Sequence, residues 1–402
     1  MTNLGFVGVG GYGRAQLEQF LPFHRSGQVR ICALADVSRE ALAAASNIEG
    51  LQDARGFDDY RAMLEMDDLD AVVISAPIPF HEEVALRAIE RGVFALLEKP
   101  PAPLMSQLER LIAADVDGKV MVAFQHVYSP LLQRMKEIVR SGEIGQPLAF
   151  SVAGIWPRST SYYERAGWAG QIFWRDRVTL DGPCTNGMSH YVNSLFYVGG
   201  ETPGSYALPS RLEGEAYRAR PVPSYDVGVL RGRFDEGSEF QAMFSHAGAE
   251  AMPVRLRAQG TLGAVELSDN NKLLCDHAGR TTAGSDGRDE LAAAFLAFVE
   301  GRKESNLTPL SEMRAYVLAT NMMLLSSGGI HSADGRFVTV HHPETPGAIY
   351  EVEGLNERFA RSYERGGSLD APWIVPPRMI TRREMDEPRL LDLLREGEPP
   401  RR

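Results

Sequence analysis

The sequence of 402 residues contains only three cysteines, Cys32, Cys184 and Cys275. Their number is odd, they are widely spaced, and no Cys-x-x-Cys pair occurs, so we expect no structural zinc site and no other bound metal. The same pattern favours a reducing compartment, and we predict a cytoplasmic protein. Cys184 lies near a candidate site described below, but a small buried apolar side chain is the simpler interpretation.

Positive charge is also scarce. The chain has 42 Lys and Arg against 53 Asp and Glu, which gives a formal net charge of −11. Binding to nucleic acid needs clustered Lys and Arg to neutralise phosphates, and an anionic membrane surface attracts the same residues. We therefore expect no nucleic-acid partner and no membrane partner.

Long apolar runs are missing as well. No uninterrupted apolar stretch is long enough to span a bilayer. The first residues, MTNLGFVGVGGYGRAQ, lack a basic segment followed by an apolar segment and a small-residue cleavage site, so we expect no secretory signal. A hydrophobic share of 44% and a charged share of 24% are typical of a folded protein, and the length predicts two domains.

The first 125 residues alternate short apolar runs with helical patterns. The predicted strands are 4–9, 29–35, 71–75, 94–97 and 120–124, and the predicted helices are 12–23, 39–46, 81–91 and 105–114. Near-continuous apolar strands alternating with helices indicate βαβ units and a buried parallel sheet. We therefore predict an α/β fold with an N-terminal, doubly wound Rossmann domain over residues 1–125.

The pattern changes from about residue 126. Polarity alternates in several predicted strands, as in an antiparallel sheet with one covered face. The strands are 148–152, 225–234, 239–245, 254–259 and 264–267, and the helices are 131–141, 187–197, 289–300 and 311–327. We predict an α+β domain over residues 126–340 with an open, mainly antiparallel sheet. Residues 341–402, rich in Pro, Gly, Arg and Glu, are expected to form a C-terminal extension that is either an extended tail wrapped over the body or partly disordered.

A glycine-rich loop joins the first predicted strand to the first predicted helix. The residues Gly8, Val9, Gly10, Gly11, Tyr12 and Gly13 fit the pattern G-x-G-x-x-G. In this context Gly8 allows a tight turn, Gly10 admits a pyrophosphate close to the backbone, and Gly13 lets the helix pack on the strand. We predict a dinucleotide site here, and the alternative is a glycine-rich turn that binds nothing.

Asp36 ends the second predicted strand. A carboxylate there accepts hydrogen bonds from both ribose hydroxyls of NAD and repels the 2′-phosphate of NADP, so we predict NAD as the cofactor, with NADP less favoured. Arg39 lies nearby and could tolerate that phosphate, and Val37 is a further expected cofactor contact. Asp36 could instead cap the next helix, although Ser38 could equally supply that cap.

Two further segments follow predicted strands at the edge where a doubly wound sheet binds its ligand. They are Ser75–His81, with Ala76 and Pro77, and Glu98-Lys99-Pro100. Lys99 is a candidate for orienting a substrate hydroxyl, although a lone Lys is usually a surface charge. His81 could equally cap or pack the following helix. Gln125, after the last predicted strand, completes the expected cofactor contacts.

The glycine loop, Asp36, Pro77 with His81, and above all Glu98-Lys99-Pro100 resemble the Gfo/Idh/MocA family, which includes glucose–fructose oxidoreductase and inositol dehydrogenase. The resemblance extends over residues 1 to about 330 and includes the turn Arg140–Pro147. It implies a nicotinamide cofactor, a sugar or polyol substrate, and hydride transfer. The half-polar sheet of the second domain further leads us to expect a homodimer or a homotetramer.

Members of that family commonly carry D-x-x-x-H on a helix facing the nicotinamide, and Asn186–His190 is the best match here. By this resemblance His190 is the proton-transfer residue and Lys99 the orienting residue, and we expect Asn186 and His190 on one helix face. Asn186 departs from the pattern because an amide cannot accept a proton, although it can hydrogen-bond a hydroxyl. Asp181 could supply a carboxylate instead, although its spacing is poor, and His190 could be a core histidine.

The segment from Trp156 to Trp174 is rich in aromatic and arginine side chains. Tyr162, Trp174 and Arg175 are candidate substrate contacts because aromatic rings stack on sugars and arginines bind hydroxyls or carboxylates. The same composition suits a subunit interface equally well. A relative that cleaves glycosides by transient oxidation, and a non-catalytic protein that senses a dinucleotide or sugar, remain the alternative functions.

Overall fold

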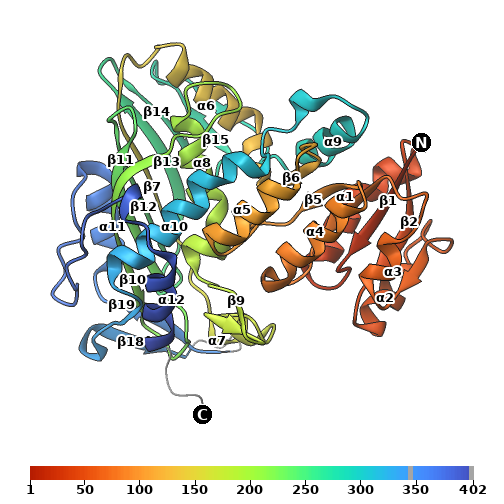
Figure 1. The fold of residues 1–402 in the computed structure, drawn as a ribbon. Coiled ribbons are helices and arrows are strands. Elements are labelled where there is room, and N and C mark those ends of the chain that lie inside the picture. The colour runs from red at the N-terminus through yellow and green to blue at the C-terminus, as the bar shows by residue number, and fades with distance from the viewer. Residues whose placement is uncertain (343–346, 398–402) are drawn as a thin grey trace. The chain divides into compact units, whose positions relative to one another are not determined.

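The computed structural model describes residues 1–342 and 347–397, which form two compact units (Figure 1). The first unit comprises residues 1–102, 106–128 and 287–313, and the second comprises 103–105, 129–286 and 314–402. The predicted boundary near residue 125 is close to the main crossing at Tyr128. The return of residues 287–313 to the first unit was not predicted. The expected extension, 341–402, falls within the second unit and includes the two stretches outside the described residues.

The first unit contains the predicted Rossmann sheet. Six parallel strands run in the order β3-β2-β1-β4-β5-β6, which places a switch point between β1 and β4. The strands are β1 (Thr2–Val7), β2 (Val29–Ala35), β3 (Arg55–Phe57), β4 (Ala71–Ile74), β5 (Phe94–Leu97) and β6 (Val120–Val122). The helices are α1 (Tyr12–Arg25), α2 (Arg39–Ser46), α3 (Tyr60–Leu64), α4 (His81–Glu90), α5 (Met105–Ala114) and, from the returning segment, α9 (Arg288–Val299).

Aromatic packing explains why the returning segment belongs to this unit. Phe20 of α1 contacts both Phe6 of β1 and Phe295 of α9, with ring centroids 5.7 and 6.3 Å apart. Phe298 of α9 packs edge-on against Phe94 of β5 at 5.2 Å. These rings fix α9 on the parallel sheet although 165 residues lie between the end of β6 at Val122 and the start of α9 at Arg288.

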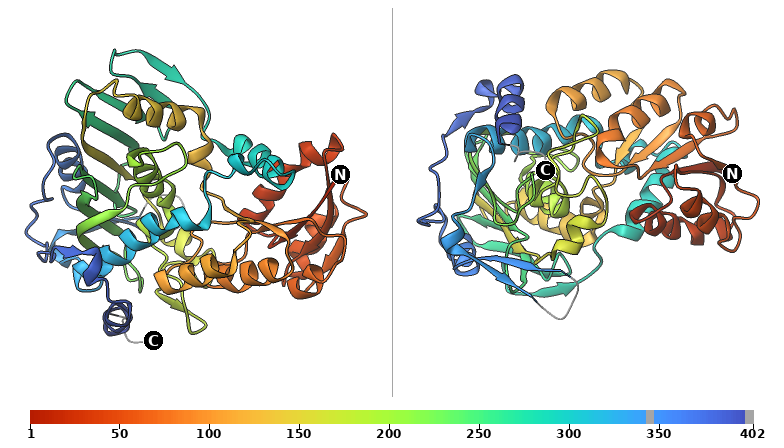
Figure 2. Two further views of the ribbon diagram at one scale, coloured as in Figure 1. Left: turned by 45° about the horizontal axis from the view of Figure 1, so that its top comes forward. Right: turned by 90° about the horizontal axis from the view of Figure 1, so that it is seen from below.

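The second unit is built on a ten-stranded mixed sheet, mainly antiparallel as predicted (Figure 2). Along its main path the order is β16-β15-β14-β13-β7-β12-β11-β10-β17, with β7 and β12 parallel to each other, and β20 (Ile380–Thr381) pairs with β10. The strands on the path are β7 (Pro147–Ile155), β10 (Pro209–Arg218), β11 (Val227–Phe234), β12 (Glu239–Ser245), β13 (Met252–Gly260), β14 (Ala264–Ser268), β15 (Leu273–Cys275), β16 (Thr281–Ala283) and β17 (His331–Ser332). The helices α6 (Pro130–Arg140), α8 (Ser189–Gly199) and α10 (Arg314–Ser327) pack against it, and a short helix α7 (Thr160–Glu164) precedes the hairpin β8 (Phe173–Trp174) and β9 (Arg177–Val178).

Strand β10 was not predicted because its charged and polar residues interrupt the apolar pattern by which buried strands are recognised. Glu215 is 1% exposed and forms an ion pair with Arg231 of the neighbouring strand β11. Arg231 also forms an ion pair with Glu213 at 3.0 Å. A charge is tolerated inside a sheet when it is paired and hydrogen bonded. The ion pair between β10 and β11 therefore allows β10 to be buried although its sequence is rich in polar residues.

The C-terminal extension is more ordered than expected. It forms the hairpin β18 (Val338–His341) and β19 (Ile349–Val352), the helix α11 (Leu355–Arg365) and the helix α12 (Glu387–Glu396). Leu355, Phe359 and Tyr363 recur every four residues along α11 and are buried against the sheet. The expected open face is therefore covered in part by the chain itself. The described part of the extension packs over the body, as one of the two alternatives had it, but as helices and a hairpin rather than as an extended tail.

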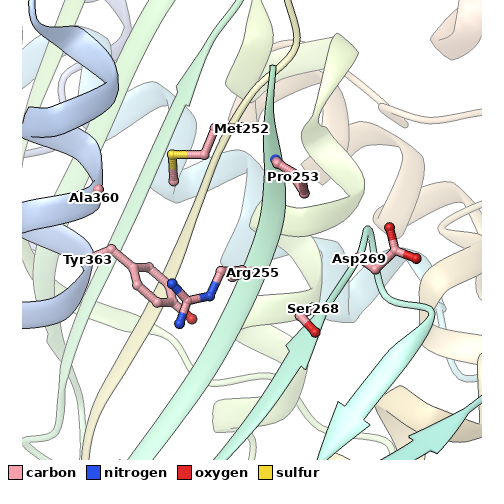
Figure 3. Close-up of a pocket in the computed structure, with 7 residues that line it drawn as sticks. All are labelled: Met252, Pro253, Arg255, Ser268, Asp269, Ala360 and Tyr363. Carbon is pink, nitrogen blue, oxygen red and sulfur yellow. The ribbon is translucent and has the colours of Figure 1, made fainter. Parts of the chain in front are cut away.

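A shallow pocket lies where α11 meets strands β13 and β14 (Figure 3). Figure 3 shows Tyr363 and Arg255 side by side, with the guanidinium 4.6 Å from the ring centre. Arg255 is already paired with Glu266 and Glu364, both at 2.9 Å. The guanidinium of Arg255 in this pocket is thus satisfied within the chain. Its lining residues are Met252, Pro253, Arg255, Ser268, Asp269, Ala360 and Tyr363.

Within residues 1–342 and 347–397, no helix has both the length and the apolar character needed to cross a membrane.

Candidate functional site

The glycine loop connects β1 to α1 at the switch point of the parallel sheet. A Cβ atom built at Gly13 would lie 2.0 Å from the carbonyl oxygen of Gly8, so only glycine lets α1 approach the end of β1 this closely. A Cβ atom at Gly11 would have no neighbour within 4 Å. The loop therefore combines close helix–strand packing with open space beside the N-terminus of α1, which is the form of a phosphate cradle.

Asp36 holds this loop in place. Its Oδ2 accepts hydrogen bonds from the backbone N–H groups of Val9 at 2.9 Å and Gly10 at 3.1 Å, and its Oδ1 accepts from Ser38 N at 2.8 Å. The N-cap of α2 is Ser38, whose Oγ accepts from Ala41 N. Asp36 thus ties the end of β2 to the glycine loop, and the alternative that it caps α2 with its own side chain is not what the structure has.

The other residues expected to contact the cofactor near the loop differ in how far they are exposed to solvent. Val37 is 91% exposed and Arg39, the first residue of α2, is also exposed. Tyr12 is 45% exposed, and its hydroxyl donates to Gln125 Oε1 at 3.4 Å. The structure therefore brings Tyr12 and Gln125 together beside the loop.

His81 connects the ends of β4 and β5. Its Nδ1 lies 2.7 Å from the carbonyl oxygen of Pro100, and its Nε2 lies 2.7 Å from that of Ala76. The side chain is 1% exposed, and burial lowers the pKa of the imidazole. Because both ring nitrogens face backbone carbonyls, His81 positions the segments that carry Pro77 and Lys99. This supports the packing role that the sequence left open.

Glu98 and Lys99 form the end of β5. The Glu98 carboxylate accepts hydrogen bonds from Gln16 Nε2 and, at 3.0 Å, from the backbone N–H of Lys99. Burial raises the pKa of Glu98, against the opposing charge of Lys99. The buried carboxylate fixes the backbone of Lys99, whose side chain is only partly buried.

One residue of this edge was missed in the sequence. His126 follows β6 and is 5% exposed, and its pKa is lowered to about 3 by burial and then by the charges of Arg288 and Lys99. It stands at the carboxyl end of its strand, as Lys99 does after β5. The rule that identified Lys99 would have identified His126 as well.

In the second unit the predicted helix 187–197 begins differently. Residues Pro183–Gly187 form a π-helical turn, in which Gly187 N bonds Gly182 O and Met188 N bonds Pro183 O. Met188 leaves the helical region with φ −120° and ψ 19°, and α8 starts at Ser189. Asn186 and His190 therefore do not share one continuous helix, and the i, i+4 face expected from their spacing is corrected. Single π turns of this kind are frequent at functional sites.

Asp181 supplies the carboxylate beside Asn186. The Asn186 Nδ2 donates to Asp181 Oδ1 at 2.7 Å, while Asp181 Oδ2 accepts from Gly170 N at 2.7 Å. Arg165 lies 3.5 Å from the same oxygen. The backbone fold, rather than helical spacing, brings this pair together, which is why the sequence spacing looked poor.

The backbone before this pair is strained. Leu180 has φ +52° although it is a fully buried non-glycine residue. Its carbonyl accepts a hydrogen bond from the Thr185 hydroxyl. Thr185 Oγ1 in turn accepts hydrogen bonds from Gly182 N at 3.1 Å and from Tyr225 Oη at 2.9 Å. Strain maintained by a buried network is typical of functional sites. It holds Asp181 and Asn186 in one arrangement.

The aromatic segment splits into two groups. Tyr162, on α7, packs against Tyr163 and His246, with ring centroids 5.1 and 5.6 Å away. Trp174 instead contacts Gly167, and Arg175 stacks on Trp174 at 4.4 Å in the β8–β9 turn. The structure thus places Tyr162 near the Asn186 turn, whereas Trp174 and Arg175 contact each other on the hairpin.

Residues 2–126 match the model of the oxidoreductase family with an NAD-binding Rossmann fold, GFO_IDH_MocA. Inositol 2-dehydrogenase of Salmonella typhimurium is 30% identical over 147 residues, which are 36% of this chain and 43% of that protein. Dehydrogenase aclE of Aspergillus oryzae is 35% identical over 227 residues, which are 56% of this chain and 59% of that protein.

The fold of both units has counterparts among solved structures. The WlbA dehydrogenase of Bordetella pertussis superposes with a TM-score of 0.69 at 22% identity, covering 81% of this chain and 96% of that one. The chain spans less than half of the length of the inositol dehydrogenases that it matches. The match to the Gfo/Idh/MocA family of NAD-binding oxidoreductases thus lies in the N-terminal domain, residues 2–126.

Proposed function

We propose that this chain transfers a hydride between NAD and a hydroxyl-bearing carbon of a sugar, a polyol or a sugar derivative. The observation that carries the proposal is the glycine loop, held by Asp36 at the switch point of the parallel sheet, within the residues that match the NAD-binding family model. The open space at Gly11 beside the start of α1 fits a pyrophosphate.

The residues of the first unit would hold the cofactor. The loop Gly8–Gly13 would bind the phosphates, and Asp36 the ribose hydroxyls. The segments carrying Ala76, Pro77 and Glu98 would surround the rest of the cofactor, together with Tyr12 and Gln125. NAD supplies the hydride acceptor of the oxidation when it is bound.

The chemical roles fall on Lys99, His190 and Asn186. We assign Lys99 to orienting the reacting hydroxyl and His190 to accepting its proton. Asn186, fixed by Asp181, would hold a substrate hydroxyl or carbonyl. Lys99 belongs to the first unit and the other two residues to the second.

The names of related proteins support a carbohydrate substrate. Relatives include inositol 2-dehydrogenases, and proteins with the same fold include a levoglucosan dehydrogenase solved with NADH and L-sorbose and a WlbA dehydrogenase solved with NADH and UDP-GlcNAcA. These similarities favour the hydroxyl groups of a ring as the reacting groups.

The test is a panel of inositols, sugars and glycosides assayed with NAD and with NADP. We expect NADH to form, seen as an increase in absorbance, with at least one class of substrate. Binding of NAD without turnover of any compound would favour the sensing protein instead. Cleavage of a glycoside without net NADH formation would favour transient oxidation.

We also propose a cytoplasmic homodimer or homotetramer. All three cysteines are free, which supports a reducing compartment. Strand β14 alternates between buried and half-buried residues, so the β13–β16 part of the sheet retains a face for a partner. Sedimentation of the full chain at micromolar concentration tests this assembly, and a monomer would contradict it.

A further inference from the structure

Two polar side chains of the second unit, His246 and Tyr162, lie beside the turn that carries Asn186. A Cβ atom built at Gly187 would lie 2.6 Å from His246 Nε2 and 3.8 Å from the Tyr162 hydroxyl. His246 is 2% exposed, and its Nε2 is buried without a hydrogen-bond partner in the described part of the chain. We call Arg158, Tyr162, Gly187 and His246 the Gly187 cluster.

Arg158 is the charged member of the cluster. Its guanidinium lies 4.7 Å from the centre of the Tyr162 ring and 5.6 Å from that of Trp156. Its Nε is buried without a hydrogen-bond partner, and within residues 1–342 and 347–397 the guanidinium forms no ion pair. Burying such a donor without an acceptor costs free energy, so its position calls for an anionic or polar ligand.

The surroundings of the cluster carry an excess of positive charge. The guanidinium groups of Arg158, Arg165 and Arg220 act on His246, and with burial as the largest cause they lower the pKa of its ring. Two carboxylates face them. Asp226 accepts from Arg220 Nε at 2.8 Å and from Ala219 N at 2.8 Å, and Asp181 is engaged by Gly170, Asn186 and Arg165.

Three cations and two carboxylates leave one positive charge uncompensated in a chain whose net charge is −11. Because both carboxylates already accept several hydrogen bonds, neither is available to Arg158. An incoming anion is therefore the group that completes the local charge balance.

The hydrogen-bonding geometry suits a carboxylate. The Tyr163 hydroxyl lies 2.9 Å from His246 Nδ1. When this hydroxyl donates to Nδ1, the neutral ring carries its proton on Nε2 and presents a donor towards Gly187. The Tyr162 hydroxyl and the Arg158 guanidinium are further donors, and a carboxylate accepts from several donors at once.

We propose that the Gly187 cluster binds the carboxylate of an acidic sugar, so that the substrates of this chain are uronic acids or their derivatives. The inference rests on the proposed function, because it places the carboxylate next to the turn of Asn186. It specifies the substrate class, which the proposed function leaves open.

The test uses hexuronates and their neutral counterparts as probes: glucuronate, galacturonate and mannuronate against the parent hexoses, and the methyl ester of glucuronate as an uncharged isostere. The variants are Arg158→Gln and Tyr162→Phe, with Arg233→Gln as the matched control because Arg233 forms an exposed ion pair with Glu239. Both NADH formation and calorimetric binding to the full chain with NADH present are measured.

We expect the wild type to bind at least one hexuronate 10–100-fold more tightly than its hexose and its ester. Arg158→Gln should remove about 10–100-fold of the affinity for the acid, the range expected for a hydrogen bond to a charged group, and leave hexose binding unchanged. Tyr162→Phe should give a smaller loss, and the control should match the wild type.

Equal binding of acid and ester, equal effects of Arg158→Gln on both, or no binding of any hexuronate would overturn the inference. Turnover of hexoses with no preference for acids would overturn it while the proposed function stands. Arg158-dependent binding of a hexuronate without any turnover would support the carboxylate site and count against the proposed oxidoreductase activity.

Discussion

At the scale of single residues, Asp181 and Asn186 show how an amide can stand where the family resemblance led us to expect a carboxylate. The pair shares one hydrogen bond of 2.7 Å, and both side chains are buried. The amide donates, so a single negative charge serves both residues. A second carboxylate at position 186 would place two like charges at hydrogen-bond distance.

Asn186→Asp should therefore lower stability and activity as the pH rises. Two facing carboxylates raise one pKa of the pair above its value in the unfolded chain, so the folded protein holds a proton that the unfolded chain has lost. Stability is then retained at low pH and falls by about 1–3 kcal/mol as the pH rises through that window, the cost of a lost buried hydrogen bond. Urea unfolding at pH 4 to 8 measures the difference from the wild type.

The double variant Asp181→Asn/Asn186→Asp is the matched control, because it exchanges the carboxylate and the amide and restores one charge per pair. We expect it to recover most of the stability that Asn186→Asp loses. An Asn186→Asp variant as stable as the wild type at pH 8 would show that the two side chains do not interact as the structure has them.

His126 predicts a second dependence on pH. Its pKa is lowered from 6.5 to about 3, so its neutral form stabilises the fold above pH 6.5, and this contribution is lost as the pH falls towards 3. Between pH 7 and pH 4 the loss is about 3 kcal/mol, from 1.36 kcal/mol per pKa unit. His126→Gln should remove this part of the pH dependence in urea unfolding, whereas the exposed control His342→Gln should retain it. Parallel stability curves for the wild type and His126→Gln would contradict the assignment.

Asp36 carries the prediction of cofactor choice. Titration should show tighter binding of NAD than of NADP, and Asp36→Ala should weaken NAD binding by about 1–3 kcal/mol, because ribose hydroxyls and the N–H groups of Val9 and Gly10 lose an acceptor. Ser38→Ala, which removes only the cap of α2, should leave the affinity nearly unchanged. Tighter binding of NADP by the wild type would refute the predicted preference.

At the scale of elements, hydrophobic periodicity predicted the strands and helices with simple patterns. Strand β12 has the predicted limits, Glu239–Ser245, and β2 and α2 do as well. The sequence could not reveal β10, since its buried Glu215 depends on a cross-strand arginine that the sequence does not pair with it. Nor could spacing show that Asn186 would lie in a π turn that ends before α8, because that geometry depends on the network of Thr185.

Helix α11 was missed although its pattern was present. Leu355, Phe359 and Tyr363 have helical spacing, but the surrounding Pro, Gly and charged residues suggested an irregular tail. Phe359 is fully buried in a cluster with Tyr217, Val229 and Trp373. Phe359→Ala should therefore lower the free energy of unfolding by about 3–5 kcal/mol, through lost burial and a cavity.

Arg361→Ala, on the exposed side of α11, is the control and should change stability by less than about 0.5 kcal/mol. Equal effects of the two substitutions would mean that α11 does not cover the sheet. Chemical unfolding followed by circular dichroism distinguishes these outcomes.

At the scale of the whole molecule, the residues with proposed roles fall into two sets, one in each unit. The loop, Asp36 and Lys99 belong to the first unit, and Asp181, Asn186, His190 and the Gly187 cluster belong to the second. The glycine loop and the strand ends could be predicted because backbone geometry demands their residue types. Arg158 and His246 could not be selected in this way. Each lies just after a strand, and their contacts with Tyr162 of α7 and with Gly187 depend on the tertiary fold.

The measurement that tests the central claim most directly is steady-state turnover of the best substrate by Lys99→Ala and His190→Ala, with NAD affinity determined in parallel. Hydride transfer assisted by these residues predicts that either variant loses about 10²–10⁴-fold in kcat/KM while binding of NAD is retained. Turnover that is indifferent to both substitutions would contradict the account.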